Sequence, residues 1–285
     1  MSIKINHLTH VYNLGTAFEK KALDDVNLEI EEGEFIGLIG HTGSGKSTLI
    51  QHLNAIMSPT EGEILLDGIN INADKSKLKA VRQRVGLAFQ YPEHQLFEMT
   101  VYKDVAFGPT NMKLTKEEID KRVRAALQTV GLPENVYEKS PFDLSGGQKR
   151  RVAIAGVLAM NPEVLILDEP TAGLDPRGRD EILDAIKKLH EERGITVILV
   201  SHSMEDVAKL VERIVVMHEG KVAMTGTPRE VFTRTHEIEK MGLASPQISY
   251  VFQALKDKGF DVPTDIYTTD EAIKALYDLV KQVKK

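Results

Sequence analysis

The chain of 285 residues contains no cysteine and no excess of basic residues. Without cysteine it forms no disulfide bond and holds no thiolate-bound metal ion, so a reducing compartment is permitted but not demonstrated. Its 36 lysine and arginine residues face 42 aspartate and glutamate residues, which gives a net charge of −6. Proteins that bind nucleic acid usually carry a basic surface, so this balance argues against nucleic acid as a partner.

Long apolar runs are also missing. The runs at 35–39, 164–167 and 195–200 are far shorter than the roughly 18 residues that cross a bilayer. The first six residues lack the apolar centre of a signal peptide. If the protein serves a membrane, we expect another chain to supply the spanning helices.

The order of apolar patterns predicts an α/β fold with a mainly parallel sheet. Residues 35–39 are typical of a strand covered on both faces, and they lead into a glycine-rich loop and a helix at 46–57. Strand patterns return at 164–167 and 195–200, on either side of a helix with Pro176 in its first turn. This alternation favours parallel strands joined by right-handed crossovers. Further strands are expected at 3–5, 26–30, 64–66, 85–89, 214–217 and 222–224.

Two other stretches are mostly helical in pattern. Between residues 91 and 160, Thr115 and Glu118 form a capping box that opens a helix ending near Gly131. Beyond His236 the pattern predicts helices at 246–258 and 269–285.

Residues 40–47 have the spacing of a phosphate-binding loop, and they lie between a predicted strand and a predicted helix, as the motif requires. Glycines let backbone N–H groups approach phosphate oxygens, and the helix N-terminus adds partial positive charge. We expect Lys46 to reach the β- and γ-phosphates and Ser47 to ligate Mg²⁺. The residues predicted to bind a nucleotide in this loop are Gly40, His41, Thr42, Gly43, Ser44, Gly45, Lys46, Ser47 and Thr48.

Two acids follow the apolar strand at 164–167. We expect Asp168 to hold Mg²⁺ through water, and Glu169 to orient and activate the attacking water. Two solvated acids after a core strand would explain the same pattern locally. Their combination with a phosphate-binding loop favours ATP hydrolysis.

Residues 144–148 read LSGGQ and open a helix expected to run to Met160. Successive backbone N–H groups at a helix start form a concave anion-binding site. The alternative is a glycine turn capped by a serine. The candidate anion-binding residues of this turn are Ser145, Gly146, Gly147 and Gln148.

The phosphate-binding loop and LSGGQ together resemble the ATP-binding cassette (ABC) ATPases, over residues 1 to about 235. The resemblance implies a RecA-like P-loop NTPase core with an antiparallel β subdomain and an inserted helical subdomain. It also implies a dimer, because in that family the LSGGQ of one subunit closes over the ATP held by another. Asp175 resembles the D-loop aspartate of the dimer interface, although a plain helix N-cap explains it equally well locally.

The same resemblance implies roles for three more residues. Gln90 resembles the glutamine that contacts Mg²⁺ and the attacking water, and His202 resembles the histidine that contacts the γ-phosphate. Tyr12 resembles the aromatic residue that stacks on adenine. The local alternatives are a surface glutamine, a structural histidine and a strand-edge tyrosine.

The implied domains are an ABC cassette at 1–235 and a helical extension at 236–285. The cassette divides into a RecA-like core at 1–90 and 160–235 and a helical subdomain at 91–159. The apolar positions of the extension suit dimerisation and packing onto its own core equally, so both interpretations stay open.

Three stretches, at 12–23, 90–98 and 150–160, resemble the ATPases of energy-coupling factor (ECF) transporters. The 40–43 loop and Gly15-Thr16 resemble the second of the two paralogous ATPases in such transporters, while Lys149 and Met99 differ from the residues expected there. An ATPase subunit of an importer, powering uptake of a vitamin or other micronutrient, is therefore implied. Its implied location is peripheral, on the cytoplasmic face of the cell membrane.

The implied partners are a paralogous ABC ATPase in a heterodimer, a transmembrane coupling protein with basic helices near 90–98, and a membrane-embedded substrate-binding subunit. The alternative is a homodimeric ATPase of a conventional ABC importer, against which the 90–98 stretch argues. ABC proteins of DNA repair or translation carry long coiled coils or two cassettes, and neither pattern is present here. A module with an inactive site is not supported, because Glu169 and His202 are both in place.

Overall fold

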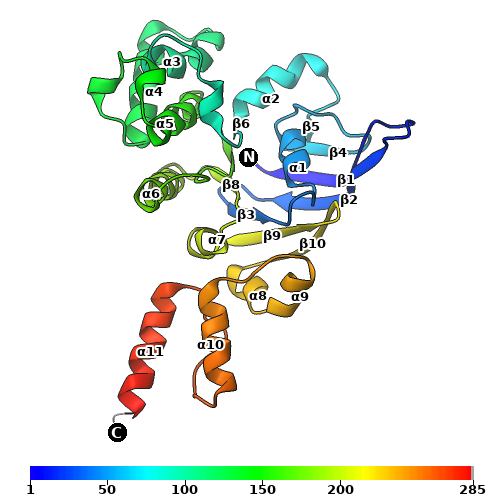
Figure 1. The fold of residues 1–285 in the computed structure, drawn as a ribbon. Coiled ribbons are helices and arrows are strands. Elements are labelled where there is room, and N and C mark those ends of the chain that lie inside the picture. Colours follow the sequence, from blue (N-terminus) through cyan, green and yellow to red (C-terminus); the bar gives the residue numbers. More distant parts are fainter. Residues whose placement is uncertain (284–285) are drawn as a thin grey trace.

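The structure is a computed structural model that describes residues 1–283, and it contains two sheets and several helices, most of which lie to one side of the sheets in Figure 1. The larger sheet has six strands in the order β10-β9-β3-β8-β7-β6. All neighbours in it are parallel except β10, which pairs antiparallel with β9. The predicted α/β class with a mainly parallel sheet is thereby confirmed. These strands are β3 (Phe35–Ile39), β6 (Val85–Ala88), β7 (Val164–Asp168), β8 (Thr196–Val200), β9 (Arg213–His218) and β10 (Lys221–Gly226).

The smaller sheet is antiparallel and has the order β2-β1-β4-β5. Its strands are β1 (Ile3–Tyr12), β2 (Lys20–Ile30), β4 (Glu61–Leu66) and β5 (Ile69–Asn70). The pairing of β1 with β2 sets Tyr12 opposite Lys20 at the loop end of this hairpin. Both strands are longer than the short alternating patterns predicted.

The central strands are buried on both faces, which explains their unbroken apolar sequences. Every residue of β3, β7 and β8 is buried. The carboxyl ends of these three strands lead directly to Gly40, Glu169 and Ser201. Parallel strands end at the same edge of a sheet, so these three chain segments meet there, where ligands of open α/β sheets bind.

Helix α1 (Lys46–Leu53) is shorter than the predicted helix at 46–57. The side chain of Asn54 donates a hydrogen bond to the carbonyl of Val85, and Ala55 takes a left-handed backbone with φ of 53°. The chain therefore turns away from the helical path at its contact with β6.

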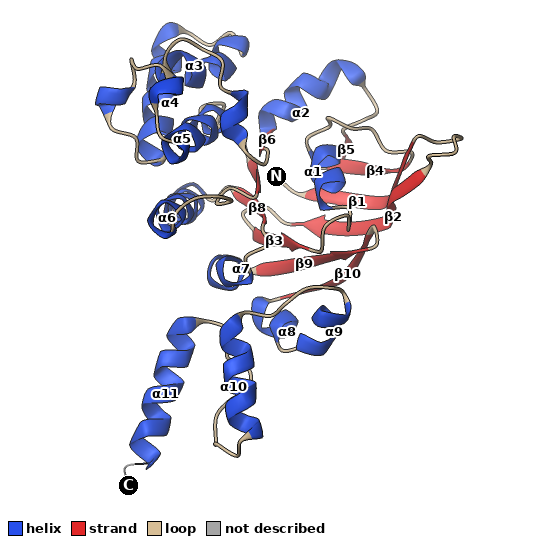
Figure 2. Ribbon diagram, viewed as in Figure 1, coloured by secondary structure: helices blue, strands red, loops and turns tan. Residues whose placement is uncertain are grey.

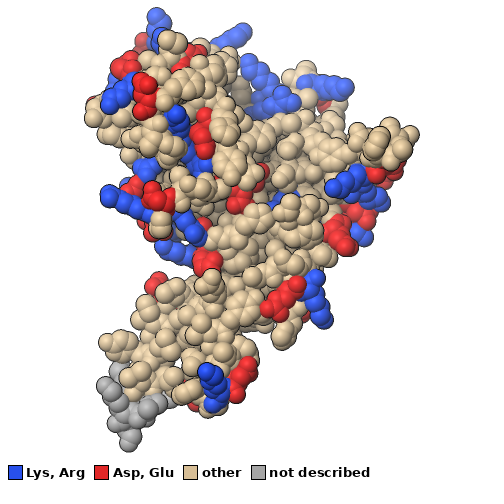
Figure 3. All heavy atoms as spheres, in the orientation of Figure 1, with Lys and Arg blue, Asp and Glu red and all other residues tan. Residues whose placement is uncertain are grey.

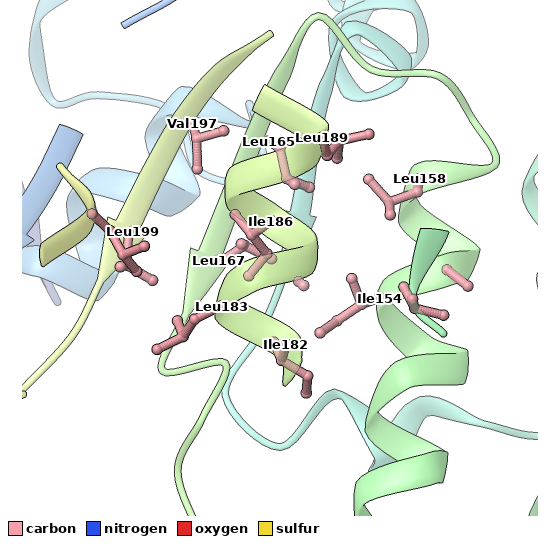
Figure 4. Packing of buried hydrophobic residues seen from close by; sticks show 14 of the residues in the cluster. Ile154, Leu158, Leu165, Leu167, Ile182, Leu183, Ile186, Leu189, Val197 and Leu199 are labelled. Carbon is pink, nitrogen blue, oxygen red and sulfur yellow. The ribbon is translucent and has the colours of Figure 1, made fainter. Parts of the chain in front are cut away.

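A group of helices stands apart from the sheets, and Figure 2 shows it at the opposite end of the view from α10 and α11. Its helix α4 is capped by Thr115, as predicted. Helix α6 connects this group to the sheet: Figure 4 shows Ile182, Ile186 and Leu189 of α6 between β7 and α5. The helices of this group are α3 (Val101–Asn111), α4 (Lys116–Thr129) and α5 (Gly146–Leu158), with α6 (Pro176–Arg193) beside them; α2 (Leu78–Arg84) instead contacts β6.

The C-terminal helices α10 and α11 have a small core of their own, made by Phe252, Val262, Ile266 and Ala272. Ile238 of α9 still packs in the main core, three residues past the boundary expected at 235. Residues 284–285 of the helix predicted at 269–285 lie outside the described residues. No helix within the described part of the chain is long and apolar enough to cross a membrane. The remaining helices are α7 (Met204–Leu210), α8 (Pro228–Phe232), α9 (Thr235–Lys240), α10 (Gln247–Asp257) and α11 (Thr269–Val283).

Candidate functional site

The loop between β3 and α1 depends on glycine. Gly43 and Gly45 have φ angles of 84° and 104°, in the left-handed region that favours glycine. A Cβ atom on Gly45 would lie 2.7 Å from the carbonyl oxygen of Ala22, so any other residue there would displace β2. The loop consequently lies tightly against β2, and helix α1 begins at Lys46 immediately after it.

Lys46 is 7% exposed, and its ammonium group is folded back on the loop. Its Nζ donates hydrogen bonds to the carbonyl oxygens of Gly40 at 2.6 Å and His41 at 3.1 Å. Burial lowers the pKa of Lys46, while Glu169 and Asp168 oppose that shift. A buried cation therefore lies near two carboxylates at the end of β7.

The two acids at the end of β7 both have raised pKa values. Burial raises the pKa of Asp168, and the nearby charge of Lys46 lowers it by a smaller amount. Burial also raises the pKa of Glu169 to about 7; the backbone of His202 and the charge of Lys46 oppose the shift, and the charges of Asp168 and Asp206 add to it. Glu169 has a left-handed backbone with φ of 51°, a conformation that non-glycine residues rarely adopt outside functional sites and turns.

His202 lies beside Glu169, with Nε2 of the histidine 3.5 Å from Oε1 of the glutamate. That Oε1 atom is buried, and within the described residues it has no hydrogen-bond partner. Burial, and then the charge of Lys46, lower the pKa of His202. The imidazole is half exposed, so one face of this arrangement is open to a ligand.

A cavity of about 380 Å³ brings most of the predicted nucleotide residues together. Gly40, His41 and Ser44 do not line it; Gly40 and His41 lie behind it as acceptors for Lys46, and Ser44 is fully buried. Lys20 and Ala22 line it as well and were not predicted. Lys20 reaches the cavity because the β1–β2 hairpin pairs it with Tyr12, a register that the sequence patterns did not predict. The predicted residues that line the cavity are Tyr12, Thr42, Gly43, Gly45, Lys46, Ser47, Thr48, Gln90, Asp168, Glu169 and His202.

Tyr12 lies at one wall of this cavity. Its hydroxyl is 3.2 Å from Oγ1 of Thr48 and donates to the sulfur of Met57 at 3.5 Å. The ring of His10 contacts it edge-on at 4.6 Å between centroids. Neighbouring side chains therefore contact both the hydroxyl and the ring of Tyr12.

The LSGGQ turn opens a second, separate hollow of about 770 Å³. Ser145 caps α5 by accepting from the backbone N–H of Gln148, whose side chain in turn accepts from the N–H of Ser145. Asp175 borders the same hollow and caps α6, accepting from the N–H of Gly178 at 2.8 Å. The local explanation of Asp175 as an N-cap is thus present in the structure. Ser145, Gly146, Gly147 and Gln148 all line this hollow, and the phosphate-binding loop does not.

The family model described as ABC transporter matches residues 23–172, just over half of the chain. The chain belongs to the ABC transporter family. A relative named energy-coupling factor transporter ATP-binding protein EcfA2, from Clostridium tetani (strain Massachusetts / E88), is 61% identical over 97% of this chain and 96% of its own length. The resemblance to ECF-type ATPases, and to the second of their paralogues, is confirmed.

Solved structures agree with this assignment. The cbiO1 protein from Clostridium perfringens, described as part of the ABC transporter complex cbiONQ, is 43% identical with a TM-score of 0.75, covering 88% of this chain and 98% of that one. A bacterial ABC transporter cassette solved as a dimer is 37% identical with a TM-score of 0.72, covering 79% and 98%. The P-loop NTPase fold is confirmed. The chain is an ECF-type ABC ATPase subunit, an enzyme that hydrolyses ATP in support of transport.

Proposed function

We propose that this ATPase forms a heterodimer with a paralogous ATPase and powers uptake of a vitamin or other micronutrient through separate membrane subunits. The observation that carries the two-chain proposal is the separation of the two nucleotide-related hollows. The phosphate-binding loop and Glu169 line one, and the LSGGQ turn lines the other. One chain therefore offers two halves of different sites, and a second ATPase has to supply the complements.

Within this chain's own half, Tyr12 stacks on adenine and the residues at 40–48 hold the phosphates. Lys46 leaves the carbonyls of Gly40 and His41 and reaches the β- and γ-phosphates, which removes the mismatch of a buried ammonium bound only to backbone oxygens. His202, beside Glu169, contacts the γ-phosphate. Catalysis here is mainly positioning and charge stabilisation.

Glu169 is the general base in this proposal. Its Oε1 atom is buried and ready for an external donor, and its pKa of about 7 suits a group that accepts a proton near neutral pH. The attacking water donates a proton to this carboxylate as its oxygen bonds to the γ-phosphorus and the bond from that phosphorus to the oxygen of the leaving ADP breaks. Gln90, on the same cavity, holds the water in line.

Mg²⁺ fits the donor set of this cavity. Ser47, Gln90 and Asp168 offer a hydroxyl, an amide and a carboxylate oxygen, which are the hard ligands that Mg²⁺ takes together with substrate phosphates. Bound there, the ion would neutralise charge on the phosphate oxygens. We assign these three residues as the groups that would hold it, Asp168 through water.

Two exposed apolar surfaces support the proposed partners. Phe97, Met99 and Phe107 are 55%, 76% and 47% exposed beside the segment after Gln90, where we place the transmembrane coupling protein.

On the C-terminal helices, Ile273 and Val280 are 54% and 52% exposed, and Figure 3 shows few charged atoms on that part of the face. We place the second ATPase on the LSGGQ hollow, Asp175 and these helices. The membrane-embedded substrate-binding subunit would be reached only through the coupling protein, and the ATPase would lie peripherally on the cytoplasmic face of the membrane.

The solution mass of Glu169→Gln protein, with and without Mg-ATP, tests the two-chain proposal. The substitution removes the base and keeps the cavity, so ATP stays bound. We expect a monomer in both conditions when the chain is alone, and an ATP-dependent complex of one to one with the co-purified second ATPase. A mass that doubles for the chain alone would instead support the homodimeric ATPase of a conventional importer.

A further inference from the structure

Arg150 is a buried arginine near the start of α5, and it is only 2% exposed. Its guanidinium makes a bidentate ion pair with Glu93, at 3.0 Å from Nε to Oε2 and 2.7 Å from Nη2 to Oε1. The remaining nitrogen, Nη1, donates to the carbonyl oxygen of Ala172 and lies 3.5 Å from that of Pro170. One planar group therefore binds two separate loops in the fork geometry that lysine does not provide.

The contact with Tyr91 adds a second constraint on the first of these loops. The guanidinium carbon of Arg150 lies 5.5 Å from the centroid of the Tyr91 ring, within cation–π range. Tyr91 has a left-handed backbone with φ of 54°, which is strained for an aromatic residue. Such strain persists where surrounding contacts hold it, and functional segments are where it concentrates. Arg150 supplies one of those contacts.

The residues that Arg150 binds lie close in sequence to the proposed functional residues. Glu93 follows Gln90 by three residues, and Ala172 follows Glu169 by three. Arg150 itself lies five residues after Ser145, on the helix that the LSGGQ turn opens. The guanidinium thus links both segments that carry this chain's proposed water-handling groups to the helix that serves the partner's ATP.

We propose that Arg150 is a positioning residue that transmits the state of this chain's own ATP cavity to its LSGGQ turn. This inference rests on the proposed function, since it assigns the turn to the partner's site. A shift of the Gln90 segment or of the Glu169 segment on nucleotide binding moves α5, because the same guanidinium holds all three. The ion pair is shielded from solvent, so salt screens it little. Arg150 touches no nucleotide in this scheme and is not a catalytic residue.

The test is the double variant Arg150→Met with Glu93→Leu. Replacing both partners of a buried ion pair with apolar residues is often neutral for stability, whereas removing one leaves an unpaired buried charge. In the membrane complex purified through a tag on this chain, we expect kcat for ATP to fall roughly tenfold, within the range of about 2- to 30-fold for coupling networks. The Kd for ATP of the chain alone, in the Glu169→Gln background, stays within about twofold of wild type because the cavity is untouched.

Two controls separate this inference from general damage and from the proposed function. Arg124→Gln removes an exposed pair with Asp120, 3.0 Å apart, on α4 of the same helical group, and it should leave kcat and Kd unchanged. Glu169→Gln in the same complex reports on the proposed base independently of Arg150. Wild-type kcat in the double variant, or a Kd that rises in step with the fall in kcat, would overturn the positioning role. If the double variant does not fold, Arg150→Lys, which keeps the buried positive charge and loses the fork geometry, carries the same readouts.

Discussion

The buried carboxyl group of Glu169 leads to a prediction about stability as well as catalysis. Its pKa is raised from an ordinary 4.5 to about 7, mainly by burial. A shift of this size corresponds to an upper limit of about 3 kcal/mol against the ionised form in the folded state. The cavity is open to water on the side of His202, which screens the charge, so we expect about 1 to 3 kcal/mol. Glu169→Gln removes the ionisation and keeps the shape.

The sign of the effect follows from proton binding. Between pH 4.5 and about 7 the folded chain holds a proton on Glu169 that the unfolded chain has lost, so stability falls as pH rises through this window. Below 4.5 both states are protonated and the substitution has little effect. Above 7 the wild type bears the full cost of a buried charge, and the variant should be the more stable protein.

Thermal melting of nucleotide-free protein at pH 5 and pH 8 measures this difference. At about 2 to 4 °C per kcal/mol for a chain of this size, Glu169→Gln should melt at least 2 °C above wild type at pH 8 and close to it at pH 5. Glu192→Gln is the matched control, because the carboxylate of Glu192 is exposed to solvent. Its Oε1 atom lies 3.7 Å from Nζ of Lys188 in an exposed pair on one helix, so its ionisation should cost the folded chain little. If the difference in melting temperature between Glu169→Gln and wild type were no larger at pH 8 than at pH 5, the buried-charge explanation would be refuted.

Three further outcomes are expected. In the assembled complex, kcat/KM for ATP should fall about tenfold for each pH unit below 7, because kcat/KM reports the nucleotide-free enzyme and the protonated Glu169 cannot accept the proton of water; a flat profile of kcat/KM between pH 6 and 8 would contradict a base with this pKa. Lys46→Ala should weaken ATP binding by at least roughly tenfold in equilibrium titration, and unchanged affinity would remove Lys46 from the phosphate site. Tyr12→Ala should weaken ATP binding by roughly tenfold through lost stacking, while Tyr12→Phe stays near wild type; equal losses in both would point to the hydroxyl instead.

The parallel core was predictable because its signals are local and strong. The strands at 35–39 and 164–167 are continuous apolar runs, and each leads into a motif with a known position relative to a strand. The end of α1 was not predictable in the same way, because it depends on the contact of Asn54 with Val85 on a distant strand. Short apolar patterns also underestimated β1 and β2, whose pairing extends through polar residues to Tyr12 and Lys20.

The candidate site was predictable from the sequence where a motif has a fixed position relative to a strand. Lys46, Asp168 and Glu169 come together because β3 and β7 end at one edge of the sheet. Lys20 and Arg150 gave no such signal: the first depends on hairpin register, and the second on loops that lie far from it in the sequence. What the sequence left out therefore depends on strand register and on contacts between segments distant along the chain.

In the proposed arrangement, each ATP site is completed by a second chain. The most direct test compares two rates of ATP turnover at the same concentration of this chain. One is measured on the chain alone, diluted to a monomer, and the other on the complex purified from the same cells. The monomer should bind ATP through the 40–48 loop. Its turnover should be slower than that of the complex by a factor of at least about 100, since no LSGGQ turn reaches its γ-phosphate. Turnover by the monomer at the rate of the complex would show that one chain contains a whole site.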